Sequence, residues 1–142
     1  MENFKELFEK FSSLRIGVVG DVMLDTYMWG HVDRISPEAP VPIVAMEKKE
    51  YRIGGAGNVA LNIQSLGASP FVLSVTGDDE DAQMLNKLFA DHHINTRHII
   101  KSNDRITTNK TRVISRNQQM MRLDAEITRD LCKEDEARLV EQ

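Results

Sequence analysis

The sequence predicts an α/β fold, in which helices cover a parallel sheet and a smaller second sheet lies beside it. Short apolar runs typical of strands, at 15–21, 69–77 and 96–102, alternate with helix-like segments at 56–66 and 78–94. This alternation is typical of parallel strands joined by helical crossovers. The extended segments at about 25–53 and 107–124 break the rhythm, so we expect them to pair with each other as an accessory sheet.

Composition is that of a single globular domain. The chain has 142 residues, 41% hydrophobic and 28% charged, with a formal net charge of -4. This length can enclose one core, and the charge does not favour nucleic acid or a membrane surface as a partner. Cys132 is the single cysteine, so no internal disulfide can form and a reducing, cytoplasmic setting is expected.

The first 14 residues predict an amphipathic helix. Charged residues interrupt the apolar ones, which argues against a signal peptide, and the polar face is not predominantly basic. We expect its apolar stripe to pack on the domain. The stripe consists of Phe4, Leu7, Phe8, Phe11 and Leu14.

The segments that follow can be assigned in order. Residues 15–21 predict a buried parallel strand ending in Gly-Asp, while Pro40 and Pro42 confine the segment 37–55 to an edge strand or an extended arm. The helix over 56–66 is expected to bury Val59, Ile63 and Leu66.

The second half of the chain continues the pattern. A core strand is expected over 69–77, and the acidic residues from 78 suit the start of a helix over 78–94. A third strand is predicted over 96–102, a β-hairpin over 107–126 with its turn near "RNQQ", and a helix from Lys133.

Glycines cluster at the beginning of the helix over 56–66. Gly54 and Gly55 precede it, and Asn58 lies in its first turn. Glycines let a ligand approach the backbone, and a helix N-terminus carries partial positive charge, so a polyhydroxylated or anionic ligand would suit this position. The alternative is a glycine turn in which Asn58 is only a local cap.

Two further groups of polar residues are candidates for ligand binding. Asp21 and Asp25 follow the first strand, at the end where α/β sheets collect ligands, and a carboxylate there can accept sugar hydroxyl hydrogen bonds. Each is alternatively a turn or cap residue. Lys110, Arg112 and Arg122 form a basic hairpin face suited to a phosphate, or else a solvated, protective edge.

The sequence does not predict a nucleotide-binding glycine motif or a metal site. The glycine spacing matches neither a phosphate-binding P-loop nor a dinucleotide fingerprint. The four histidines show no metal-ligand spacing, and no metal site is predicted.

The motifs together resemble the ribokinase-like (phosphofructokinase-B type) carbohydrate kinases. "GGAGNVA" is similar to that family's N-terminal sugar-binding signature, and "GDVMLD" to its first strand-to-loop element. More closely, these stretches, with "RISPEAPVPIV" and "SRNQQMMRLD", resemble the kinase domain of bacterial bifunctional heptose enzymes. The resemblance extends from about residue 14 to residue 126.

The resemblance implies a ribokinase-like three-layer fold with a β-sheet lid formed by about 25–53 and 107–124. The implied reaction is ATP-dependent phosphorylation of D-glycero-β-D-manno-heptose 7-phosphate at O1, assisted by Mg²⁺, on the route to ADP-heptose and lipopolysaccharide. The implied partners are this sugar phosphate and a second copy bound through the lid. The implied substrate-binding residues are Asp25, Gly54, Gly55, Asn58, Lys110 and Arg122.

One part of the family pattern is missing from residues 1–142. The resemblance implies a "GAGD" segment carrying the general base, and we expect it beyond Gln142. Residues 1–142 are therefore expected to form the N-terminal part of the kinase domain and to be inactive alone. Two alternatives remain open: a non-catalytic sugar-phosphate-binding or lid-mediated dimerisation module, and a kinase of the same family with another substrate.

Overall fold

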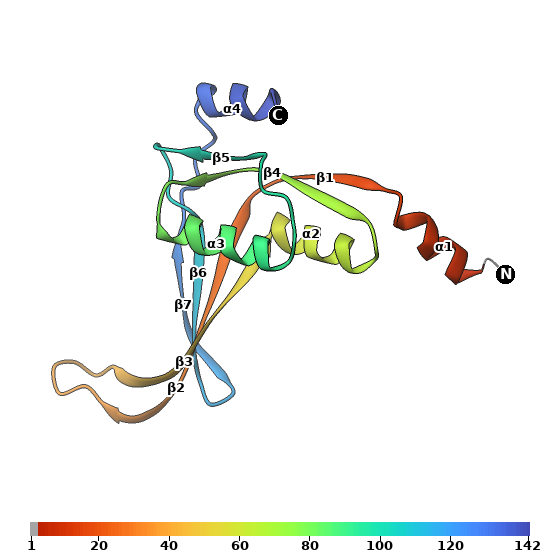
Figure 1. Ribbon diagram of the computed structural model, residues 1–142. Helices are drawn as coiled ribbons and strands as arrows, with labels where there is room; N and C mark the ends of the chain where they lie inside the picture. Colours follow the sequence, from red (N-terminus) through yellow and green to blue (C-terminus); the bar gives the residue numbers. More distant parts are fainter. Residues whose placement is uncertain (1–2) are drawn as a thin grey trace.

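The computed structural model describes residues 3–142 and arranges them around two sheets (Figure 1). The first sheet is parallel, with the strand order β1-β4-β5. Helices α2 and α3 lie on one side of it and α4 on the other, so this part has three layers (Figure 1). Its elements are β1 (Arg15–Val19), α2 (Ala56–Ser65), β4 (Ser69–Gly77), α3 (Glu80–Asp91), β5 (Ile99–Ser102) and α4 (Lys133–Val140).

The second sheet has four strands in the order β3-β2-β6-β7 and extends away from the first (Figure 1). Its strands are β2 (Val22–Ile35), β3 (Pro42–Gly55), β6 (Asn109–Ser115) and β7 (Gln118–Ala125). Strand β2 pairs antiparallel with β3 and parallel with β6. The expected pairing of the two extended segments is therefore confirmed, and β3, which begins at Pro42, is an edge strand as predicted.

The hydrophobic core joins the two sheets. Leu24 and Ile53 come from the second sheet, Val72 from the first, and Leu85 and Phe89 from α3. All five side chains are buried. Because β2 alternates its side chains, Leu24 and Thr26 face this core while Asp25 faces the opposite way. The packing of the core thus decides which face of the second sheet is polar.

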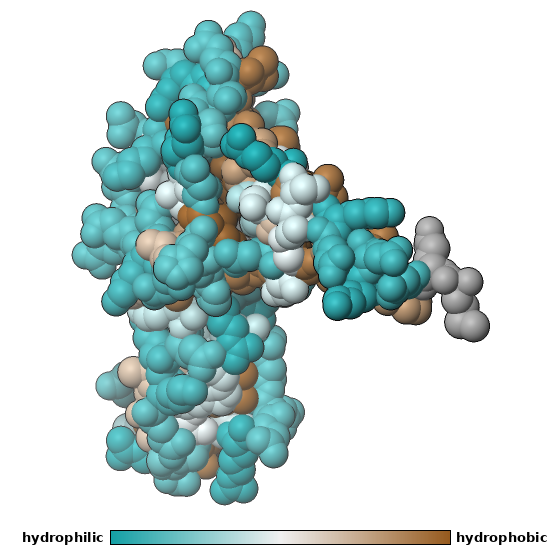
Figure 2. Space-filling model, turned by 45° about the vertical axis from the view of Figure 1, so that its right-hand side comes forward, coloured by the Kyte–Doolittle hydropathy of each residue, from teal (hydrophilic) through white to brown (hydrophobic). Residues whose placement is uncertain are grey.

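Three sequence-based expectations about packing are wrong. Helix α1 (Phe4–Phe11) forms but buries no residue; Phe4 is 74% exposed, and the helix projects to the side (Figures 1 and 2). Strand β1 is an edge strand of its sheet in the described part of the chain, with Val19 71% exposed. Helix α2 turns Gly57 and Ala60 inward, whereas Val59 and Leu66 are exposed.

Helix α2 turns its smallest residues inward because it packs very closely on the core. A Cβ atom at Gly57 would approach Phe89 Cζ to 2.8 Å and would clash with Ile53, so the smallest residues face the core.

In residues 3–142 no helix is both long and apolar enough to cross a membrane.

Candidate active site

The glycine pair lies where strand β3 passes into helix α2, beside Asp25. In the β2–β3 ladder Met23 is paired with Gly54 and Asp25 with Arg52. A Cβ atom on Gly54 would be 2.5 Å from Asp25 Oδ2, so glycine at this position leaves room for the carboxylate. The structure thus brings Asp25 within contact distance of the residue pair that begins α2.

Gly55 has a different role from Gly54. It is the N-cap of α2, with φ of 59°, a left-handed conformation that favours glycine. A Cβ atom here would also meet the carbonyl oxygen of Asp21, which accepts a 2.9 Å hydrogen bond from the Ala56 amide. The junction of β3 and α2 is therefore fixed by backbone contacts to the loop that leads into β2.

Asp25 lies on a polar face of the second sheet and forms an ion pair across it. Arg112 Nη1 donates a 2.6 Å hydrogen bond to Asp25 Oδ1, although the two residues are 87 positions apart in the sequence. Burial is intermediate for both side chains, about a fifth of each being exposed. The hydrogen bond to Asp25 raises the pKa of Arg112, so the guanidinium group stays charged at neutral pH.

Aromatic rings continue this face along β2. Tyr27 and Trp29 stack with ring centroids 5.4 Å apart. Arg52 Cζ lies 4.6 Å from the Tyr27 centroid and Arg112 Cζ lies 5.2 Å from it. These arginines come from the strands on either side of β2, and both guanidinium groups approach the tyrosine ring.

The other two predicted basic residues are on the same face but are engaged by carboxylates. Lys110 Nζ donates to Asp124 Oδ2 at 3.2 Å and to Glu126 Oε2 at 2.8 Å. Arg122 Nε donates to Asp124 Oδ1 at 2.8 Å. Hydrogen bonds donated by Arg122 and Lys110 lower the pKa of Asp124. The bonds that Lys110 donates to Glu126 and Asp124 raise its own pKa.

Asn58 is in the first turn of α2, four positions after Gly54, and is exposed. Within residues 3–142 its side chain makes no hydrogen bond to another protein group. It is not a side-chain cap of α2, because the N-cap position is Gly55 and no side-chain cap bond is formed there. The structure therefore leaves its amide available to a ligand.

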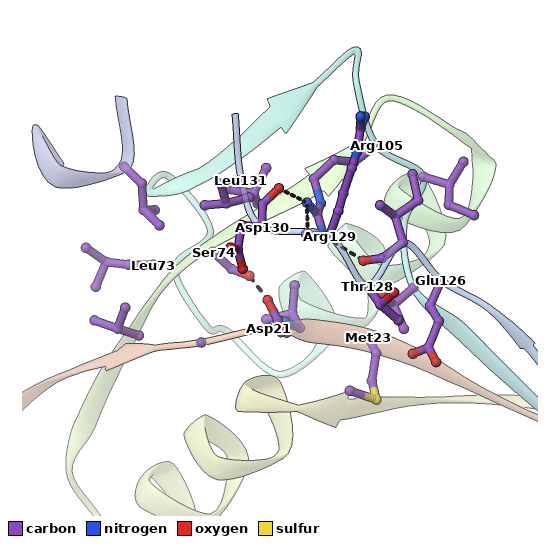
Figure 3. Close-up of a pocket in the computed structure, with 18 residues that line it drawn as sticks. Asp21, Met23, Leu73, Ser74, Arg105, Glu126, Thr128, Arg129, Asp130 and Leu131 are labelled. Carbon is purple, nitrogen blue, oxygen red and sulfur yellow. Dashed lines mark hydrogen bonds between the residues drawn. The ribbon is translucent and has the colours of Figure 1, made fainter. Parts of the chain in front are cut away.

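A cavity lies next to this site rather than in it. It has a volume of about 460 Å³ and lies at the carboxyl end of β1, beside β4 (Figure 3). Asp21, Met23 and Glu126 line it, but none of the six predicted substrate-binding residues does. Asp21, which the sequence placed at the ligand-binding end of the sheet, thus faces a different space from Asp25.

Sequence reasoning missed the residues that organise this cavity and the polar face. Arg105 donates to the backbone carbonyls of Ile127 and Arg129 at 2.7 and 3.0 Å, and so holds the segment after β7 against the loop before β6 (Figure 3). Arg52 and Tyr27 were also missed. The period-two alternation of strands could have placed Arg52 on the face of Gly54, but not across the sheet from Arg112.

The fold defines a broad class. A parallel sheet covered by helices, with a mixed second sheet beside it, is an α/β architecture. The family model "pfkB family carbohydrate kinase" matches residues 14–140. The chain therefore belongs to the pfkB family of carbohydrate kinases.

The relatives that this chain resembles in sequence include proteins named as bifunctional. The chain is 46% identical over 136 residues to "Bifunctional protein HldE" of Trichlorobacter lovleyi, covering 96% of this chain and 28% of that protein. It is 48% identical over 122 residues to the protein of the same name from Coxiella burnetii, covering 86% and 25%. The chain thus spans less than a third of the length of these relatives.

Solved structures share the fold. A carbohydrate kinase from Agrobacterium tumefaciens matches with a TM-score of 0.64 at 19% identity, over 78% of this chain and 35% of that one. Arabidopsis thaliana ribokinase, complexed with ribose and ATP, matches with a TM-score of 0.60 at 15% identity, over 77% and 35%. At these identities the likeness establishes the ribokinase-like fold.

Proposed function

We propose that this chain is the sugar-binding part of an ATP-dependent kinase that phosphorylates D-glycero-β-D-manno-heptose 7-phosphate at O1. The observation that carries the proposal is the position of Asp25, whose carboxylate lies over Gly54 at the start of α2. The likeness to the bifunctional proteins over nearly the whole chain supports the choice of sugar, through the sequence resemblance described above.

In this proposal Asp25 accepts hydrogen bonds from sugar hydroxyls. Arg112 holds one oxygen of the carboxylate at 2.6 Å and so fixes its orientation, while lone pairs on both oxygens remain for hydroxyl donors. Hydrogen bonds to an ionised acceptor are about twice as strong as neutral ones. Asn58 would donate and accept from the helix side, and Gly54 and Gly55 would let the sugar approach the backbone.

The second sheet, whose polar face carries Asp25, would act as a lid over the sugar. Its cationic residues would receive the phosphate that the substrate already carries. Lys110 and Arg122 are candidates for this role, although each now binds Asp124. The lid would exclude water from the sugar, which strengthens the electrostatic contacts of the site.

ATP and Mg²⁺ belong to the proposal for the complete domain. ATP would supply the phosphoryl group, and Mg²⁺ would neutralise charge on its phosphates. Within residues 3–142 no group of three His, Cys, Asp or Glu side chains is placed to hold a metal ion, and we assign Mg²⁺ no ligand among them. The contribution of the described residues is to bind and orient the sugar.

Isothermal titration calorimetry with the 142-residue chain tests the proposal. Heptose 7-phosphate is expected to release heat of binding, and Asn58→Ala is expected to weaken binding by about tenfold, the effect of losing one or two hydrogen bonds. A panel containing fructose 6-phosphate and ribose 5-phosphate tests the alternative substrate. Binding of a panel member in preference to the heptose would replace the proposed substrate, and no binding of any sugar phosphate would overturn the proposal.

A second candidate function is self-association through the second sheet. Strand β7 is an edge strand whose residues are all exposed, and Met121 and Leu123 are 52% and 56% exposed. An exposed apolar edge favours pairing with another chain. Analytical ultracentrifugation of the chain and of Leu123→Lys tests it, because a dimer formed there is expected to become monomeric on substitution. A monomeric unaltered chain at all concentrations would exclude this candidate.

A further inference from the structure

Arg52 and Arg112 form a matched pair of guanidinium groups on the polar face. Arg52 is on β3, Arg112 is on β6, and both guanidinium groups approach the ring of Tyr27 on β2, which lies between these strands in the sheet. Arginine favours the faces of aromatic rings, and the contact limits the motion of an otherwise flexible side chain. The ring therefore gathers two positive groups, from the strands on either side of β2, around one aromatic side chain.

Both guanidinium groups retain unused donors. Arg52 uses Nε toward Glu50 Oε1, at 2.7 Å, and Arg112 uses Nη1 toward Asp25 Oδ1 and the Lys110 carbonyl. In the part of the chain that the structure describes, the terminal Nη atoms of Arg52 and the Nε and Nη2 atoms of Arg112 donate to no protein group. A guanidinium has five N–H donors in a planar fork that matches phosphate oxygens.

Solvent exposure distinguishes Arg52 from the neighbouring basic residues. Its side chain is 55% exposed, whereas Lys110 is 18% exposed and is held by two carboxylates. Arg122 is exposed but lies on the outer strand β7, two strands away from β2. A dianion that reaches the face beside Tyr27 from solvent therefore meets the exposed guanidinium group of Arg52, whose single hydrogen bond is to Glu50.

We propose that Arg52 and Arg112, both packed against Tyr27, form a clamp for the phosphate group that the sugar substrate already carries. This inference rests on the proposed function and assigns Arg52 as a residue that determines specificity for phosphorylated over unphosphorylated sugar. Asp25 and Glu50 hold the two guanidinium groups in place, and Glu50 competes with the phosphate for Arg52. Glu50 also accepts a 2.8 Å hydrogen bond from Lys48, which adds a third cation at the edge of the clamp.

The test is calorimetric titration of the full 142-residue chain with heptose 7-phosphate and with the same heptose lacking the phosphate. Arg52→Met is expected to weaken binding of the phosphorylated sugar by about tenfold or more and that of the unphosphorylated sugar by less than about twofold. Lys49→Met is the matched control, because Lys49 is on the same strand and its ammonium group lies over Tyr51 on the opposite face. It is expected to change neither affinity.

Glu50→Gln provides an independent second variant. It removes the competing carboxylate while keeping the shape of the side chain, and it is expected to tighten binding of the phosphorylated sugar by about threefold or more. If Arg52→Met weakens both sugars equally, or leaves the phosphorylated sugar unaffected, the clamp is refuted while the proposed function stands. If neither sugar binds the unaltered chain, the proposed function fails and the clamp fails with it.

Discussion

At the scale of single residues, two adjacent glycines solve two different packing problems. Gly54 leaves space for the carboxylate of Asp25, and Gly55 adopts a left-handed backbone conformation that turns the chain from β3 into α2. The sequence indicated that something approaches the backbone at this point. The structure adds that an Asp25 oxygen from the same chain is among the groups that do so.

Gly55→Ala is expected to lower the free energy of unfolding by about 2–4 kcal/mol, since it adds left-handed strain and a clash with the Asp21 carbonyl. Gly67→Ala is the matched control: Gly67 also has positive φ, 97°, but a Cβ there meets nothing within 4 Å. It is expected to cost only about 1 kcal/mol. Equal losses for the two variants in urea denaturation would show that the Asp21 contact is unimportant.

Asp79 is a second residue whose effect can be predicted. It accepts hydrogen bonds from the amides of Ala82 at 2.8 Å and Thr107 at 2.7 Å, and so caps α3 and holds the loop before β6. Burial alone raises the pKa of Asp79, but the bonds from Thr107 and Ala82 outweigh it and lower the pKa.

Because the folded-state pKa of Asp79 is lowered, its contribution is present above the unfolded pKa of about 3.9 and is lost as pH falls through the folded value. Asp79→Ala is expected to lower the free energy of unfolding by about 1–3 kcal/mol at pH 7. It is also expected to reduce the loss of stability that the unaltered chain shows as the pH falls below about 4. Urea denaturation at a series of pH values measures both. The same dependence of stability on acidic pH in the variant and in the unaltered chain would contradict this role of Asp79.

At the scale of elements, the spacing of apolar residues predicted where helices and strands lie better than it predicted which surfaces they pack against. All three strands of the first sheet and the hairpin of β6 and β7 were predicted. The apolar stripe of α1 was also recognised, but the helix does not pack on the domain, because an amphipathic pattern does not specify which surface covers it. In α2 the glycine and alanine face the core, since close approach to Ile53 and Phe89 overrides the larger apolar residues.

The far end of the β2–β3 ribbon contains a histidine between two carboxylates. His31 Nδ1 is 2.6 Å from Glu47 Oε1 and Nε2 is 2.9 Å from Asp33 Oδ2. The hydrogen bond to Glu47, followed by the charge of Asp33, raises the pKa of His31 above its ordinary value, while Arg116 opposes the rise. The charged form therefore links the two strands beyond the bulge at Gly30.

A raised folded-state pKa gives stability that is fully present below the unfolded value of about 6.5 and is lost as pH rises through the folded value. The protection factors of the amides in 31–35 and 42–46, which correct for the base-catalysed rise of intrinsic exchange with pH, are therefore expected to fall through that window, in step with an NMR titration of His31. His31→Gln is expected to abolish this fall while leaving the protection of α3 unchanged. Protection factors that stay constant across the titration would refute the link.

At the scale of the whole molecule, the fold class and the elements that carry the candidate site residues could be predicted from the sequence, but the electrostatic arrangement of these residues could not. Turn chemistry and alternation placed Asp25, Gly54 and the basic hairpin on their elements. The parallel pairing of β2 with β6 brings Arg112 to Asp25 over 87 positions, and such register has no local signal. For the same reason Tyr27 and its two arginines are visible only in the assembled sheet.

The central claim is that the Asp25 carboxylate binds the sugar, and calorimetric titration with heptose 7-phosphate tests it most directly. Asp25→Asn retains the shape of the side chain but removes its charge, and we expect binding to weaken by about tenfold to a hundredfold. Asp33→Asn, on the same strand but at its far end, is expected to leave the affinity unchanged. Equal affinities for the unaltered chain and Asp25→Asn would contradict the account.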